Sequence, residues 1–250
     1  MDTRKLHLIG YLLTALLGLS ACALPDRSLD LRAHAQAVVA DPSRSGADQQ
    51  IDARRHPVDL LVFAQIEPGL RVLDLGTGGG YSTELLARAV APGGVVYGQD
   101  APPVNERAGA SFNRRMGGSA GGSVVRLLRP FDDPLPEGSP PLDRITLLNV
   151  YHDLTFRPVD RERMNQRLFA ALRPGGLLVV SDHSAQAGAG AETGRRLHRI
   201  DEGLVRREIE AAGFRFVAGA DFLRRPEDSR TERISAGAAI DEFVIKFVRP

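Results

Sequence analysis

The stretch Val72-Leu73-Asp74-Leu75-Gly76-Thr77-Gly78-Gly79-Gly80-Tyr81 decides the fold that we expect. An apolar run containing an acidic residue leads into a turn rich in glycine, and a helical pattern then covers residues 82–90. Glycine lets the backbone turn sharply and lets a ligand lie close against it. The helix start beyond the turn offers backbone N–H groups without partners inside the helix. We therefore predict a buried strand, a tight turn and a helix. The alternative is an ordinary strand–helix turn without a ligand.

Composition narrows the classes of function. The chain has 250 residues, of which 43% are hydrophobic and 25% charged, as in globular proteins with one large or two small domains. Its net charge is +1 and it contains no block of basic residues. This argues against a nucleic-acid partner held by electrostatic attraction.

The N-terminus forms a separate unit. Arg4 and Lys5 precede an apolar run at residues 8–19, which is shorter than the roughly 20 residues that a membrane-spanning helix needs. Leu19-Ser20-Ala21-Cys22 follows, and the pattern resembles a bacterial lipoprotein signal. The resemblance implies cleavage before Cys22, lipidation of its thiol, export and attachment to a membrane, with the outer membrane facing the periplasm as the expected location. An ordinary signal peptide or an uncleaved apolar anchor are the alternatives. Cys22 is the only cysteine, so an intrachain disulfide is excluded.

Strand and helix patterns alternate along the rest of the chain. Helical patterns separate most of the strands, which indicates an α/β fold with a doubly wound, mostly parallel, seven-stranded sheet. The last strand is expected to be antiparallel, because residues 224–237 read as a loop rather than as a crossover helix. We expect a signal peptide at residues 1–21, a tether with a short helix at residues 22–50, and one domain at residues 51–250. The predicted strands cover residues 71–75, 95–100, 124–128, 144–150, 177–181, 214–218 and 243–248.

The glycine turn fits one class of nucleotide site better than two others. A dinucleotide fingerprint needs a third Gly or Ala where this chain has Tyr81 or Thr83, and a phosphate-binding P-loop needs a Lys that the turn lacks. The remaining pattern, Asp74-x-Gly76-x-Gly78-x-Gly80, resembles the class I S-adenosylmethionine-dependent methyltransferases, which have a Rossmann-like fold. Asp100 at the end of the second strand and the segment Leu172-Arg173-Pro174-Gly175-Gly176 agree with that family.

The resemblance implies S-adenosylmethionine as cofactor and a methyl acceptor, which we expect to be a small molecule. The glycine turn would support the methionine part, Asp100 the ribose hydroxyls, and Asp132 the adenine amino group. For Asp132 the alternative is a solvated loop. Ligands of open α/β sheets bind beyond the carboxyl ends of the strands, where Asn149 is also expected. The predicted cofactor-binding residues are Asp74, Gly76, Gly78, Gly80, Asp100, Asp132 and Asn149.

A narrower resemblance concerns three later segments. Tyr151-His152-Asp153-Leu154, Asp182-His183-Ser184-Ala185 and Leu197-His198-Arg199-Ile200-Asp201 resemble a group of exported, predicted bacterial methyltransferases. This resemblance implies the fold more than it implies a particular reaction.

Three of these histidines follow strands or loops at the same predicted edge. A histidine beside a carboxylate can act as a general base near neutral pH, so we expect His152 to be the base, Asp153 to orient it or contact substrate, and His183 to assist. His198, Arg199 and Arg55 are expected to contact the substrate, and the two arginines suit either an anionic group of the substrate or the carboxylate of the cofactor. The alternative is that each histidine only bonds loop backbone. The histidines are not arranged in a short metal-binding motif such as His-x-x-x-His, so we assign no metal ligand, although a metal site stays open as an alternative.

The sequence thus predicts methyl transfer from S-adenosylmethionine to an unidentified acceptor. Export of the chain argues against this activity, because S-adenosylmethionine is made in the cytosol. Two alternatives therefore stay open. One is a non-catalytic ligand-binding or regulatory lipoprotein that reuses the fold, and the other is a metal-dependent periplasmic enzyme.

Overall fold

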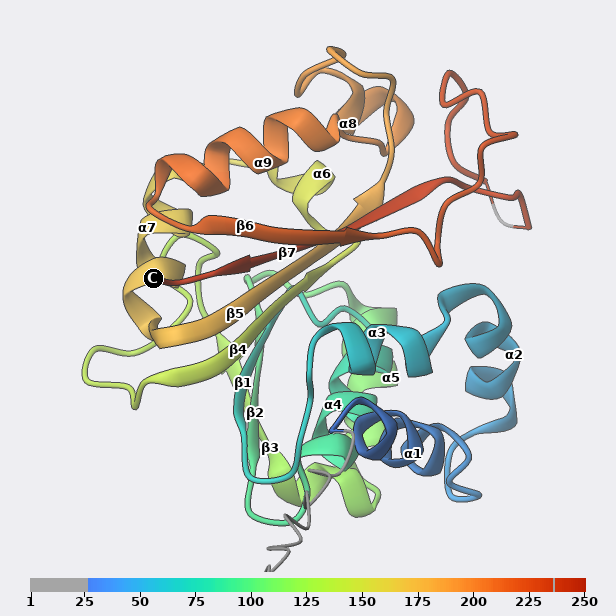
Figure 1. The fold of residues 1–250 in the computed structure, drawn as a ribbon, viewed down its shortest axis with the longest axis vertical. Helices are drawn as coiled ribbons and strands as arrows, with labels where there is room; N and C mark the ends of the chain where they lie inside the picture. Colours follow the sequence, from blue (N-terminus) through green and yellow to red (C-terminus); the bar gives the residue numbers. More distant parts are fainter. Residues whose placement is uncertain (1–26, 236) are drawn as a thin grey trace, which may run out of the picture.

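A computed structural model describes residues 27–235 and 237–250, so the predicted signal and Cys22 lie outside the described residues. One sheet of seven strands, in the order β3-β2-β1-β4-β5-β7-β6, runs through the molecule (Figure 1). The strands are β1 (Arg71–Leu75), β2 (Val95–Asp100), β3 (Val124–Leu128), β4 (Leu142–Leu148), β5 (Leu172–His183), β6 (Arg215–Ala220) and β7 (Glu242–Val248).

The strand directions confirm the predicted fold class. β1 to β5 pair in parallel, whereas β7 lies antiparallel to both β5 and β6. The chain reaches β7 through a loop, and a loop connection allows an antiparallel neighbour where a parallel one would need a crossover. β5 begins at Leu172, earlier than predicted, because Leu172 already pairs with Leu142 of β4, and the N–H of Gly175 donates to the carbonyl of Arg249 at 2.8 Å.

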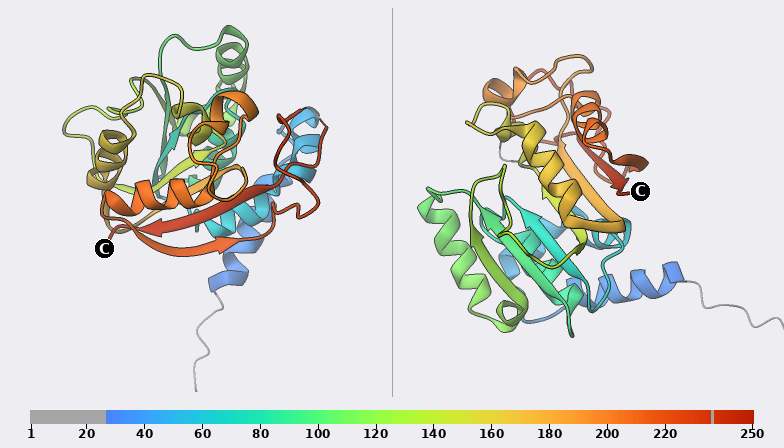
Figure 2. Two further views of the ribbon diagram at one scale, coloured as in Figure 1. Left: turned by 90° about the horizontal axis from the view of Figure 1, so that it is seen from above. Right: turned by 90° about the vertical axis from the view of Figure 1, so that its left-hand side faces the viewer.

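Helices cover both faces of the sheet and create two hydrophobic cores (Figures 1 and 2). On one face, apolar residues of α1, α3 and α4 pack against Val72, Val96 and Val179. On the other face, α6, α7 and α9 pack against Leu73, Leu75 and neighbouring strand residues. The helices are α1 (Arg27–Val39), α2 (Gly46–Arg55), α3 (Pro57–Phe63), α4 (Tyr81–Val90), α5 (Glu106–Met116), α6 (Tyr151–Leu154), α7 (Arg161–Ala171), α8 (Thr193–Leu197) and α9 (Glu202–Ala211), with a short 3-10 helix, η1 (Ser119–Ser123).

The described part of the predicted tether, residues 27–50, packs onto the domain. Ala35 and Val38 of α1 are buried in the same core as Leu61 of α3. A second helix, α2, follows within this segment, because the hydroxyl of Ser45 accepts a hydrogen bond from the N–H of Asp48 and caps the helix. Residues 27–50 therefore belong to the folded domain. Within the described residues, no helix is both long and apolar enough to cross a membrane.

The topology gathers the chemistry-bearing residues at one edge. β1 pairs with β2 on one side and β4 on the other, so the strand order reverses beside β1. The carboxyl ends of these strands lead into Gly76, Asp100 and Asn149, and β5 ends at His183. This reversal point is where open α/β sheets bind ligands.

Candidate functional site

The glycine turn, defined as residues 76–80, needs glycine for two different reasons. Gly76 has φ +78°, and a Cβ atom there would lie 2.7 Å from Cγ2 of Val150. Gly78 has φ +51°, and no described atom lies within 4 Å of where its Cβ would stand. Gly80, with φ +82°, caps the start of α4. Gly76 therefore allows close packing, whereas Gly78 leaves the backbone open to a ligand.

Asp74 stabilises the glycine turn through buried hydrogen bonds. Its carboxylate is buried and accepts hydrogen bonds from the hydroxyls of Thr83, at 2.7 Å, and Thr146, at 2.8 Å. Burial raises the pKa of Asp74 to about 6, although the two hydroxyl donors act in the opposite direction. Asp74 thus ties β1 to β4 and α4, and this positions the turn.

Asp100 joins the turn to the end of β2. Its Oδ2 accepts from the hydroxyl of Thr77, and its Oδ1 accepts from the N–H of Gly78 at 3.2 Å. Burial raises the pKa of Asp100, an effect that these two donors oppose. A carboxylate has about four lone-pair sites, so two more hydroxyl donors can still bind here.

A cleft of about 280 Å³ opens above the turn. Arg54 and Arg55 of α2 line it together with Gly78, Tyr81 and Asn149. The guanidinium of Arg55 lies 5.7 Å from the ring centroid of Tyr81. The cleft therefore places two cations opposite the open backbone of Gly78, which suits a ligand with a carboxylate.

A second hollow, of about 440 Å³, begins at Ala101, the residue that follows Asp100. Asp132 lines it with Ala101, Phe131 and Val159. Its largely apolar wall and single carboxylate suit a flat ring that carries an amino group. The neighbouring Asp133 instead pairs with Arg167 at 2.7 Å.

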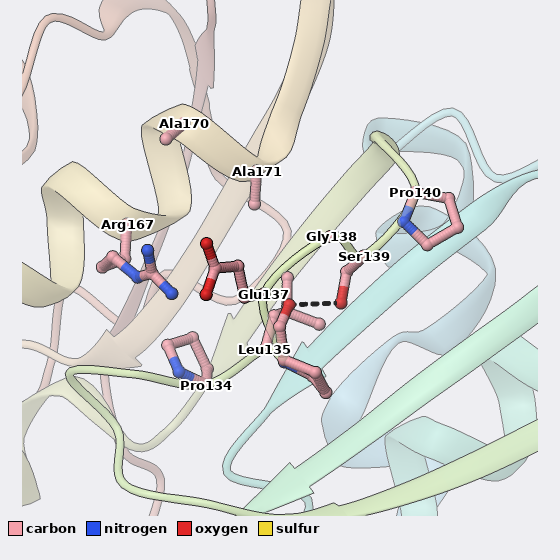
Figure 3. Close-up of a pocket in the computed structure, with 10 residues that line it drawn as sticks. Pro134, Leu135, Glu137, Gly138, Ser139, Pro140, Arg167, Ala170 and Ala171 are labelled. Atoms are coloured by element: carbon pink, nitrogen blue, oxygen red, sulfur yellow. Dashed lines mark hydrogen bonds between the residues drawn. The ribbon is translucent and has the colours of Figure 1, made fainter.

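The hollow in Figure 3 belongs to a different part of the fold. It measures about 160 Å³ and lies between residues 134–140 and the end of α7, where Arg167 and Ala171 face the loop. The hydroxyl of Ser139 donates to the carbonyl of Pro136 at 2.7 Å and holds the loop (Figure 3). β4 and β5 begin here, so this hollow lies at the edge of the sheet opposite the glycine turn.

The structure brings the predicted histidines together. In what we call the histidine cluster (His152, Asp153, His183 and His198), Nε2 of His152 lies 3.3 Å from Nδ1 of His198 and 3.3 Å from Oδ1 of Asp153. The rings of His152 and His183 are 5.4 Å apart between centroids. His198 has φ +54°, an unfavourable conformation for a histidine, and such strain is concentrated at functional sites.

Asp182 holds His152 in place. Its Oδ1 lies 2.6 Å from Nδ1 of His152, and its Oδ2 accepts from the backbone N–H of His152 at 2.8 Å. Asp182 precedes His183 directly in the sequence, but its carboxylate lies 3.8 Å from Nδ1 of the His183 ring, beyond hydrogen-bond distance. The end of β5 therefore points its carboxylate at the start of α6.

These contacts change the expectation for the base. Burial alone would lower the pKa of His152, but the carboxylates of Asp153 and Asp182 outweigh it and raise the pKa to about 9. His152 as arranged here is therefore protonated at neutral pH and has no free lone pair. Burial lowers the pKa of His183 to about 4, so that ring is neutral.

Asn149 connects the histidine cluster with the cleft. Its Nδ2 lies 3.2 Å from Nε2 of His183 and donates to Oε2 of Glu242 at 3.1 Å. The hydroxyl of Ser181 donates to its Oδ1 at 3.1 Å. Asn149 has φ +58° and also lines the cleft, so one fixed amide borders both parts of the site.

Arg199 is not placed to contact a substrate, contrary to the expectation. Its side chain is only 1% exposed and pairs with Asp228 at 2.8 Å, and it also donates to the carbonyls of Ser184 and Glu232. Asp201, three residues after His198 in the sequence, caps α9 by accepting from the N–H of Gly203 at 3.0 Å. The carboxylate nearest His198 is that of Asp153, at 3.5 Å.

Four residues that contribute to the site were not predicted from the sequence. Arg54 has a local signal, since it follows the Ser45 cap within a polar helical segment. Thr77 lies inside the quoted turn. Glu242 and Arg233 have no local signal, because they reach the site from loops and strands distant in sequence.

Comparison with known proteins agrees with this geometry. Residues 47–224, more than half of the chain, match the protein family described as "Methyltransferase domain". The structure is similar to that of a SAM dependent methyltransferase from Aquifex aeolicus, with a TM-score of 0.58 and 19% identity, covering 82% of this chain and 97% of that one. It is also similar to the CcbJ methyltransferase from Streptomyces caelestis (TM-score 0.53, 16% identity, 79% and 89% covered) and to the [4+2]-cyclase SpnF (0.55, 17%, 78% and 82%).

At such identities the solved structures establish the fold alone, and one of them is titled as a cyclase. The family match, together with the seven-stranded sheet and the site at its reversal point, establishes membership. This chain belongs to the methyltransferase-domain family.

Proposed function

We propose that this chain transfers a methyl group from S-adenosylmethionine to a small-molecule acceptor. The observation that carries the proposal is the 3.2 Å contact between Asn149, in the wall of the cleft, and His183, in the histidine cluster. A ligand in the cleft and an acceptor at the cluster would therefore be neighbours. Family membership supports methyl transfer as the class of reaction.

The residues around the cleft fit the parts of S-adenosylmethionine. Asp100 retains acceptor sites for ribose hydroxyls, and the backbone at Gly78 is open to a ligand. Arg54 and Arg55 would hold the methionine carboxylate. Asp132, in the adjoining hollow, would accept from the adenine amino group. Asp74 contributes to binding indirectly, by positioning the glycine turn.

The cofactor, when bound, supplies an electrophilic methyl group that passes to a nucleophilic atom and leaves S-adenosylhomocysteine. The protein's part is to align that atom, since orientation supplies much of the rate in such transfers. His152, Asp153 and His183 provide the polar atoms on the acceptor side. The side chains of His152 and His183 are only 5% and 13% exposed, and this recess suits a small acceptor.

Calorimetric titration with S-adenosylhomocysteine tests the proposal without knowledge of the acceptor. We expect saturable binding by the purified chain. Asp100→Ala should weaken it by about 2 kcal/mol or more, roughly 30-fold, because two hydrogen bonds to a charged group are lost. Asp133→Asn is the matched control, since Asp133 pairs with Arg167 outside the cleft. Absence of binding by folded wild-type protein would refute the proposal.

A separate proposal concerns where the protein acts. Cys22 lies outside the described residues, and the lipoprotein-like segment before it supports export and lipid anchoring at its thiol. Metabolic labelling with a fatty acid should mark the membrane fraction of wild-type cells and not that of a Cys22→Ser variant. Equal labelling of both proteins would contradict the anchor.

A further inference from the structure

We propose that His152, Asp153 and His198 form a binding site for a divalent metal ion, with geometry suited to zinc. Nε2 of His152, Nδ1 of His198 and Oδ1 of Asp153 face one another. Their separations are 3.3 Å between the two nitrogens, 3.3 Å from His152 to Asp153, and 3.5 Å from His198 to Asp153. These three atoms form a nearly equilateral triangle.

The size of the triangle matches tetrahedral coordination. Zinc bound at about 2.0–2.1 Å by nitrogen and carboxylate ligands needs neighbouring ligand atoms about 3.3–3.4 Å apart. Octahedral magnesium, bound at about 2.0–2.1 Å, would need adjacent ligand atoms about 2.9 Å apart and prefers oxygen ligands. Two imidazoles and one carboxylate therefore favour zinc or a similar transition metal.

The surroundings of His152 are those of a metal ligand. Metal-binding histidines usually give their other ring nitrogen to a carboxylate, which fixes the tautomer and the ring orientation. Asp182 is in that position, with Oδ1 at 2.6 Å from Nδ1 of His152. Asp182 is itself buried and bonded to two backbone N–H groups, those of His152 and His183. The remaining nitrogen, Nε2, is thereby aimed at Asp153 and His198.

A second group in the described residues, His152, Asp182 and His183, is a poorer site. There, Nδ1 of His152 and Oδ1 of Asp182 are 2.6 Å apart, which is a hydrogen-bond distance and too short for two ligands of one ion. Asp182 therefore does not bind the ion itself but orients His152, which does.

Two features must change when the metal binds. His152 must release the proton on Nε2, because only the neutral ring can bind the ion through that nitrogen. The contact between Arg233 and His198 must also break. Arg233 donates through its guanidinium to Nε2 of His198. A histidine that binds metal through Nδ1 carries its proton on Nε2 and cannot accept from Arg233 there. Arg233 is exposed, and its other bonds go to the carbonyls of Arg195 and Arg196. Arg233 thus competes with the metal by occupying the nitrogen that must be protonated and by adding positive charge.

Three protein ligands leave a fourth position for water or for an acceptor atom. A hydroxyl or thiol bound there would release its proton to solvent near neutral pH, and the anion would stay bound to the metal. Asn149 and His183 lie between this position and the cleft. This consequence rests on the proposed methyl transfer and assigns the acceptor to the alcohols, phenols or thiols, whereas the metal site itself does not depend on that activity.

Zinc titration of the full chain, after treatment with a chelator and in the absence of cofactor, tests the site. Wild-type protein should bind one zinc ion, and Co²⁺ in its place should give the visible absorption of a tetrahedral site. His198→Ala and Asp153→Ala should each weaken zinc binding by more than about 100-fold. Removing a residue that only supports a metal ligand typically weakens binding by about 10- to 100-fold. Arg233→Met should tighten it.

His56→Ala is the matched control. His56 has a similar exposure to His198, 34% against 29%, and lies 3.7 Å from Asp59, but the described part of the chain offers it no third ligand. This variant should bind zinc as wild type does. Circular dichroism checks that each variant is folded.

Absence of saturable binding by the wild type would overturn the proposal, as would unchanged affinity in folded His198→Ala and Asp153→Ala variants. Weaker binding by Arg233→Met would also contradict it. Since S-adenosylhomocysteine binding is measured separately, failure of the metal site is distinguishable from failure of the proposed methyl transfer.

Discussion

Replacing Asp74 by Asn should stabilise the protein at neutral and alkaline pH. Burial raises the pKa of Asp74 from 3.8 to about 6, against the opposing effect of the hydroxyls of Thr83 and Thr146. A group whose pKa is raised on folding stabilises the native state fully below its unfolded pKa, and that contribution is lost as pH rises through the folded pKa. Above pH 6 the native state thus carries the cost of a buried charge.

The structure sets the size of the effect. The gap between 3.8 and about 6, at about 1.4 kcal/mol per pH unit, amounts to about 3 kcal/mol. Asn has nearly the same shape, accepts from one threonine hydroxyl and can donate to the oxygen of the other. The difference in unfolding free energy between Asp74→Asn and wild type should therefore rise from near zero at pH 4 to as much as about 3 kcal/mol at pH 8.

Urea denaturation at constant ionic strength, repeated from pH 4 to pH 8, measures this difference. Subtracting the unfolding free energy of the wild type from that of the variant at each pH cancels the contributions of all other titrating groups. Asp133→Asn is the control. Burial by itself would raise the pKa of Asp133, but Arg167 and Arg129 together outweigh it and lower the pKa, so the difference curve should be flat between pH 5 and pH 8. A flat curve for Asp74→Asn, or a variant less stable than wild type at pH 8, would refute the reasoning.

Two further predictions concern the glycine turn and Arg199. Gly76→Ala should cost about 2–4 kcal/mol of stability in denaturation experiments, because its Cβ would meet Val150 at 2.7 Å and its φ is +78°. Gly78→Ala should cost only about 1–2 kcal/mol but should weaken S-adenosylhomocysteine binding measured by calorimetry, because its Cβ would enter the open cleft; the reverse pattern would contradict these roles. Arg199→Met should destabilise by about 3–5 kcal/mol, since it leaves Asp228 without its buried partner. The folded fraction of this variant should bind S-adenosylhomocysteine as tightly as wild type. Loss of affinity in the folded variant would instead indicate that Arg199 contacts the ligand.

The fold was predictable because its signals are local. The apolar run before Gly76 and the helix after Gly80 both lie within one short stretch, and the loop at residues 224–237 indicates the antiparallel last strand. The strand ends then place Asp100, Asn149 and His183 at one edge by topology alone.

The contacts within the site were less predictable because they join residues distant in sequence. Adjacency suggested that Asp182 serves His183, yet its carboxylate points across to His152, thirty residues earlier. Likewise, Arg199 follows His198 directly, but its guanidinium is directed into the fold toward Asp228. Neighbours at the end of a strand point in different directions, so sequence spacing shows which residues reach the edge and not which ones meet there.

Packing of the first helices was missed for a different reason. α2 is polar, and its start depends on the Ser45 cap rather than on an apolar stripe. Its Arg54 and Arg55 enter the cleft only because the helix docks beside Tyr81. This docking depends on tertiary contacts such as the hydrogen bond from the Tyr81 hydroxyl to Asp52 at 2.6 Å.

A crystal structure of the chain soaked with S-adenosylmethionine tests the central claim most directly. We expect density along the glycine turn, with the ribose hydroxyls on Asp100, the carboxylate at Arg54 and Arg55, and the methyl group directed toward Asn149 and His183. A fully occupied cofactor bound elsewhere, or a glycine-turn cleft that stays empty at saturating cofactor, would contradict it.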